Sequence, residues 1–124
     1  MKTESFHLFL SRTDVNLAQR SRPLVKAILS FETKYGKPPE QLEQLVPDFL
    51  SAVPNTGIGA YPTYEYTTIA DKAVYEGNPW ILKVQTPSGG INWDMFMYFP
   101  KQNYPKTGYG GMLEPIEDWA YVHE

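Results

Sequence analysis

The sequence lacks cysteine and has only two histidines among its 124 residues. Without cysteine the chain forms neither disulfides nor thiolate metal sites, so its cysteine content favours no redox compartment. His7 and His123 are the only side chains that ordinarily titrate near neutral pH, and each stands near a chain end. Chain ends seldom hold the geometry that a catalytic base needs. We therefore expect no catalytic residue and no cofactor.

Long apolar runs and a strong charge of one sign are also missing. No stretch approaches the roughly 20 apolar residues that cross a bilayer, and "FHLFL" at residues 6–10 is too short for a signal core. The net charge of −3 gives no field that collects nucleic acid. Lys and Arg nevertheless outnumber Asp and Glu before residue 41. This basic leading segment is either a solvated helix face or a segment that lies beside an anionic membrane.

Proline, glycine and aromatic residues are plentiful instead. The chain has 11 prolines, 9 glycines and 15% aromatic residues, and 42% of it is hydrophobic. This composition argues against disorder and predicts many turns. A chain of this length buries a core without disulfides or metals, so we expect a single loop-rich domain over residues 1–124.

A helical pattern occupies the first third of the chain. Apolar residues recur at spacings of seven, four, three and four at Leu17, Leu24, Ile28, Phe31 and Tyr35. The pattern predicts one long helix that ends at residue 35, with Gly36 in the left-handed conformation just beyond it. It begins at about residue 14 or, because Pro23 disturbs a helix interior, at about residue 23 with Ser21 as its cap.

A proline-rich corner follows this helix. Pro38 and Pro39 fit the first turn of a second, short helix near residues 39–45, and Pro47 interrupts it. Leu42 and Leu45 supply an apolar face that folds back on the long helix. The structural motif of this corner comprises Gly36, Pro39, Leu42, Leu45, Pro47 and Pro54. It requires no chemistry.

From Tyr61 onward the apolar period changes to two. The segments "TYEYTTI", "WILKVQT", "NWDMFMYF" and "DWAYVHE" predict four antiparallel strands. In the third strand Met95 and Met97 occupy one face while Phe96 and Tyr98 occupy the other, so we expect that strand to be central. The predicted fold class is α+β, with the N-terminal long helix and the short helix packed on a four-stranded antiparallel sheet.

Residues 17–69 resemble the head of the type II secretion pseudopilins and type IV pilin-like proteins, among them uncharacterised pilin-like envelope proteins. The positions that carry the resemblance are Ala27, Phe31, Tyr35, Gly36, Pro39, Leu42, Leu45, Val46, Pro47, Phe49, Leu50, Pro54, Tyr64 and Tyr66. It implies a pilin-like domain that acts without turnover, as a structural or assembly component of the bacterial cell envelope. The implied partners are envelope or secretion-system proteins.

The chain departs from the family in its N-terminal features. It shows no leader, no processing glycine, no glutamate at the fifth mature position and no apolar helix. Two readings stay open: a periplasmic or inner-membrane-tethered domain whose membrane segment is absent from this chain, or a pilin-like fold that never polymerises and is cytoplasmic. Major pseudopilins also hold calcium in a C-terminal loop, but those ligands cannot be matched here residue by residue. Glu117 and Asp118, near Gly110 and Gly111, offer oxygen ligands without the alternation of acids that an EF-type loop has, and loop solvation explains them. We expect no metal site.

A binding module is the alternative function. Tyr61, Trp80, Tyr104, Tyr109 and Trp119 are candidates for a stacking platform for sugars or peptide, although rings in a small sheet protein mostly fill its core. The candidate ligand-binding residues are Tyr104, Tyr109 and Trp119, because loops carried by rigid scaffolds favour binding. Asp94 and Asp118 form a possible carboxylate pair whose separation the sequence does not give.

Overall fold

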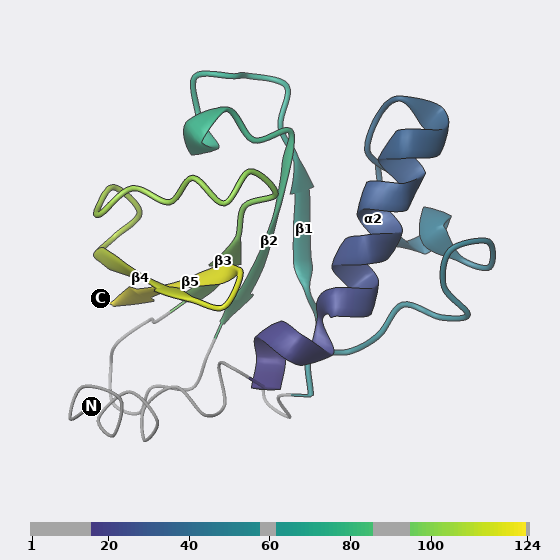
Figure 1. Ribbon diagram of the computed structural model, residues 1–124, viewed down its shortest axis with the longest axis horizontal. Coiled ribbons are helices and arrows are strands. Elements are labelled where there is room, and N and C mark those ends of the chain that lie inside the picture. Colours follow the sequence, from purple (N-terminus) through teal and green to yellow (C-terminus); the bar gives the residue numbers. More distant parts are fainter. Residues whose placement is uncertain (1–15, 58–61, 86–94, 124) are drawn as a thin grey trace.

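The computed structural model describes residues 16–57, 62–85 and 95–123. Its largest element is a five-stranded antiparallel sheet in the order β1-β2-β3-β5-β4 (Figure 1). The strands are β1 (Glu65–Thr68), β2 (Trp80–Gln85), β3 (Met95–Tyr98), β4 (Met112–Ile116) and β5 (Trp119–His123). Among the described residues, the α-helix α2 (Arg22–Tyr35) and two single-turn 3-10 helices, η1 (Leu42–Leu45) and η2 (Tyr75–Gly77), accompany them, and a short helical segment at residues 16–20 precedes α2.

The predicted long N-terminal helix is wrong. Residues 16–20 are helical, a turn follows at Ser21, and α2 then has only 14 residues. Pro23, in the first turn of α2, has no amide hydrogen to continue the ladder from the preceding turn. Ser21 stands at the N-cap position but makes no capping hydrogen bond with its side chain: its backbone is helical (φ −86°, ψ −6°), whereas a capping residue is usually extended, and its hydroxyl donates back to the Leu17 carbonyl. A start at residue 14 lies outside the described residues.

The predicted count of four strands is also wrong, because β4 forms a fifth. Its sequence "MLEPI" places a single buried apolar residue on each face, Leu113 on one and Ile116 on the other. No apolar alternation is therefore visible in it. Pro115 is tolerated because β4 lies at an edge of the sheet and pairs only with β5 among the described strands. The sheet is antiparallel and β3 is its middle strand, as predicted.

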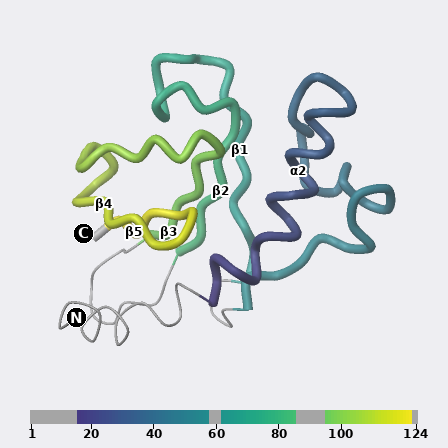
Figure 2. The backbone as a smooth tube through the Cα atoms, viewed as in Figure 1, coloured from purple at the N-terminus to yellow at the C-terminus, as the bar shows by residue number. Residues whose placement is uncertain are grey.

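The proline corner contains a single 3-10 turn where a short helix was expected. Gln41 and Gln44 close a capping box around η1, and Val46 is already extended. Gly36 ends α2 in the left-handed conformation with φ 78°, as predicted, and its amide donates to Glu32. Figure 2 traces the chain from α2 through this corner and back to β1.

Two apolar clusters lie on opposite faces of the sheet. On the first face, Trp80, Phe96 and Trp119 pack with α2, η1 and the segment before Ser21. On the second face, Ile81, Met97 and Val122 pack with rings from the loops that precede β2 and β4. Figure 1 shows α2 on one side of the sheet and the loop after β3 on the other. The predicted faces of β3 are confirmed, since Phe96 and Tyr98 belong to the first cluster and Met95 and Met97 to the second.

Candidate binding groove beside strand β1

A groove of about 430 Å³ lies between the proline corner and the start of the sheet. Three segments line it: Glu40–Glu43 from the corner, Val53–Asn55 from the following loop, and residues around β1, namely Pro62, Thr63, Tyr64 and Tyr66. Its volume lies in the range of about 300–1,000 Å³ that is typical of ligand sites. We refer to it below as the β1 groove.

Hydrogen bonds from its two tyrosines hold the groove together. The Tyr66 hydroxyl donates to the carbonyl oxygen of Pro39 at 2.5 Å and so ties β1 to the proline corner. The Tyr64 hydroxyl lies 2.6 Å from the Ser21 hydroxyl, which ties the residue before β1 to the start of α2. Burial raises the pKa of both phenols, so both remain neutral at physiological pH. The floor is therefore built from fixed, uncharged rings.

The rim of the groove carries negative charge. Glu40 and Glu43 are exposed, and within the described part of the chain no hydrogen bond or ion pair involves either carboxylate. No described Lys or Arg belongs to the lining, but Arg20 lies beside it, donates to Asn55 at 3.4 Å and interacts electrostatically with Tyr64. An occupant of the groove thus meets two available carboxylates beside a half-buried tyrosine ring.

The groove also lies against one edge of the sheet. Among the described strands β1 pairs only with β2, and Glu65, Thr67 and Thr68 are exposed. The opposite edge, β4, carries Pro115, which cannot donate to a further strand. The two edges therefore differ: one is blunted by proline, and the other presents threonines with high strand propensity next to a groove.

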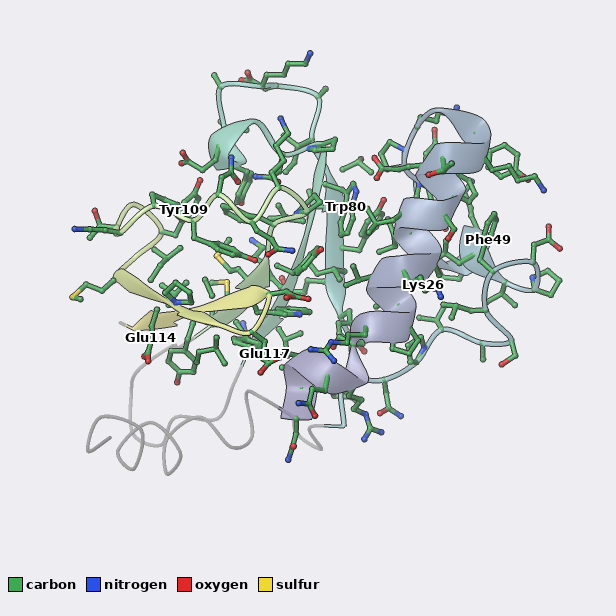
Figure 3. All side chains as sticks on the ribbon, in the orientation of Figure 1. Lys26, Phe49, Trp80, Tyr109, Glu114 and Glu117 are labelled. Carbon is green, nitrogen blue, oxygen red and sulfur yellow. The ribbon has the colours of Figure 1, made fainter. Side chains whose placement is uncertain are left out.

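The sequence-predicted ligand residues do not form one site. Trp119 is 1% exposed and packs in the first cluster, stacked on Phe96 at 4.9 Å between ring centroids. Tyr104 and Tyr109 belong to the second cluster, on the opposite face of the sheet. Figure 3 shows Tyr109 on the far side of the sheet from α2, with Trp80 between the sheet and the helix. Tyr61, the fifth ring of the suggested platform, lies outside the described residues.

The two tyrosines of the loop are engaged within the protein. Tyr104 accepts a hydrogen bond from the Phe99 amide at 3.0 Å and donates to the carbonyl of Asp118. Tyr109 stacks on Tyr75 at 5.6 Å, and its hydroxyl donates to Glu76 at 3.1 Å. Burial raises the pKa of Tyr109 to about 12, and the Glu76 carboxylate acts in the same direction. Tyr109 thus joins the loop after β3 to the loop before β2, and Tyr104 joins it to the β4–β5 turn.

Backbone strain accompanies this junction. Tyr75, Glu76 and Gly77 have φ values of 50°, 57° and 80°, a left-handed run in which only the glycine is free of side-chain strain. The buried Asn78 supports the run: its amide donates to the carbonyl of Tyr75 and to Asn103, both at 2.8 Å. Hydrogen bonds from Asn78 to Asn103 and from Asn103 to the carbonyl of Glu76 hold the loop before β2 against the loop after β3, and so maintain the strained run.

The acidic candidates near the C-terminus have other partners. Glu117 accepts a hydrogen bond from Arg22 at 2.8 Å, which joins the β4–β5 turn to the start of α2. Asp118 contributes its carbonyl to Tyr104. Within the described ranges, no group of three or more His, Cys, Asp or Glu side chains is placed to hold a metal ion. Asp94, His7 and the side chain of His123 lie outside the described residues.

Sequence reasoning did not single out the carboxylates of the β1 groove. The sequence pattern identifies Pro39, Leu42 and Pro54 only as elements of the corner. The available signal was the pair Glu40 and Glu43 in "KPPEQLEQL", three residues apart and without a basic residue between them. The pair becomes part of a candidate binding site because β1 lies at an edge of the sheet. The edge position of β1 is known only from the strand order.

Comparison of the chain with known proteins identifies no relative. No protein-family model matches the chain, and neither a curated protein nor a solved structure does. None of the helices that the structure describes has the length and apolar character needed to cross a membrane.

Proposed function

We propose that this protein acts without turnover, as an assembly or structural component of the bacterial cell envelope that works through protein contacts. The observation that carries the proposal is the β1 groove, which lies directly beside a strand edge without a described partner. An open strand edge recognises extended polypeptide through its backbone, and an adjacent groove adds side-chain selection. The resemblance of residues 17–69 to pilin-like heads supports the envelope as the location and its proteins as the partners.

Site-specific photo-crosslinking in the bacterial host tests this function. A benzophenone amino acid in place of Thr63, which is exposed and lines the groove, is expected to give one discrete protein adduct in the envelope fraction. The same amino acid in place of Met112, which is 67% exposed on the opposite edge strand, is the matched control and is expected to give none. The full-length gene product is expected to fractionate with the envelope. Absence of a protein adduct at Thr63, or a wholly cytosolic product, would contradict the proposal.

A further inference from the structure

We infer that the occupant of the β1 groove is an extended peptide segment bearing lysine or arginine, which adds to β1 as a further antiparallel or parallel strand. This inference rests on the proposed function, because it names the chemistry of the partner that the groove receives. Three features of the described residues carry it: the open edge, the side chains that flank it, and the charge of the rim.

The edge sets the backbone conformation of the occupant. A strand that pairs with β1 lies about 4.8 Å from it and directs alternate side chains to the same face of the sheet. Tyr64 and Tyr66 point to the face that bears α2, where the groove lies. Side chains of the added strand that point to this face opposite Tyr64 and Tyr66 therefore reach the groove, while the intervening ones point to the opposite face with Glu65 and Thr67.

The lining sets the character of the side chain that enters. Leu42, Val53 and the half-buried Tyr66 offer apolar surface below an exposed acidic rim. Lysine and arginine have an aliphatic stem and a charged end, so they can pack on such a surface while the charge reaches the rim. A ring at the base favours a cation further.

The rim sets the charge of the occupant. Among the described residues of the lining, the charged ones are Glu40 and Glu43, and both are carboxylates. An acidic side chain in the groove would lie near two like charges, whereas a basic one would form charge-assisted hydrogen bonds with them. Selection between basic and acidic segments therefore comes from repulsion as well as attraction.

A displayed library of random peptides of about ten residues, the length of a long strand, provides the test. Selection on the wild-type protein is expected to enrich sequences with Lys or Arg among strand-forming residues. Their affinity, measured by fluorescence anisotropy, is expected to fall about tenfold or more in the double variant Glu40→Gln, Glu43→Gln and on raising the salt from about 0.05 M to about 0.5 M. The matched control Glu65→Gln removes a carboxylate from β1 on the opposite face and is expected to retain the wild-type affinity.

Backbone pairing is tested on the same selected peptides. N-methylation of every second peptide amide has two possible phases, the odd-numbered or the even-numbered amides. In one phase the methyl groups replace the amide hydrogens that point toward β1, and in the other they replace those that point away, which leaves the hydrogen bonds to β1 intact. One phase is expected to lose binding about tenfold or more and the other to lose little. The inference is overturned if no peptide is enriched, if the enriched peptides are not basic, if the double variant binds them as tightly as wild type, or if both methylation phases behave alike.

The two proposals fail in different ways. A protein adduct at Thr63 together with a library that enriches acidic or purely apolar peptides would leave the proposed function standing and remove this inference. Absence of the adduct would remove the function itself.

Discussion

The hydroxyl oxygens of Ser21 and Tyr64 lie 2.6 Å apart in the core. Ser21 donates its only hydroxyl proton to the Leu17 carbonyl at 2.7 Å, so Tyr64 must be the donor to Ser21. The resulting chain of two hydrogen bonds joins the helical segment before the turn, the start of α2 and the floor of the β1 groove. The contact between Ser21 and Tyr64 therefore joins the break in the helix to the groove.

Removing the Ser21 hydroxyl is expected to lower the free energy of unfolding more than removing the Tyr64 hydroxyl. Ser21→Ala leaves the buried Tyr64 hydroxyl without its acceptor, so we expect a loss of about 1 to 3 kcal/mol in the free energy of unfolding. Tyr64→Phe leaves the Ser21 bond to Leu17 intact, and we expect about 0.5 to 1.5 kcal/mol. Urea denaturation measures both. A double variant that loses the full sum of the two values would show that the hydroxyls do not act on each other.

Truncation of the leucines in the proline corner is expected to destabilise the protein strongly. Leu45 is 0% exposed and Leu42 is 7% exposed, and both pack in the first cluster. We expect Leu45→Ala and Leu42→Ala each to cost about 2 to 5 kcal/mol. Asp48→Ala, at an exposed position of the same corner, is the control and should cost less than about 0.5 kcal/mol. Unchanged denaturation midpoints in both leucine variants would contradict the packing of the corner.

Alkaline conditions are expected to destabilise the fold through its buried tyrosines. Burial raises the pKa of Tyr104, partly offset by the hydrogen bond from the Phe99 amide, and burial likewise raises the pKa of Tyr66. Unfolded tyrosines lose their protons near about pH 10 while these folded ones keep theirs. Above that pH the unfolded state binds fewer protons, so the free energy of unfolding falls as pH rises.

Urea denaturation between about pH 8 and about pH 11 checks this effect. The variant Tyr104→Phe removes one of the contributing phenols, so we expect its stability to fall less over that range than the wild type's, although it is less stable at neutral pH. A variant with the wild-type slope would show that Tyr104 does not contribute.

Metal removal is expected to leave the stability unchanged. The carboxylate of Glu117, one of the two residues considered as calcium ligands, already pairs with Arg22. A chelator should therefore give the same melting temperature as untreated protein in differential scanning calorimetry. A rise of several degrees on adding calcium would contradict this expectation and strengthen the comparison with the pseudopilins.

The sequence predicted those parts of the fold that depend on local patterns. Gly36 follows α2 in the conformation expected of a helix-ending glycine, and Leu42 and Leu45 are buried as their spacing indicated. The two faces of β3 follow from strict alternation. Each of these features is decided by neighbours within a few residues in the chain.

The errors concern features that are decided by distant contacts. The segment "MLEPI" becomes a strand because β5 pairs with it, and Pro115 is acceptable only because no further described strand follows. The sequence makes Trp119 and Tyr109 candidates for one aromatic platform, yet they lie on opposite faces of the sheet. The β1 groove escaped prediction for the same reason, since Glu40 and Glu43 meet β1 only after the chain has folded back.

Amide hydrogen exchange of the complex tests the central claim most directly. With the partner identified by crosslinking at Thr63 bound, we predict slower exchange in residues 65–68 of β1 and in residues 40–43 of the groove rim, and unchanged exchange in residues 112–116 of β4. Protection confined to the loop after β3 or to the outer face of α2, with β1 unchanged, would contradict the account.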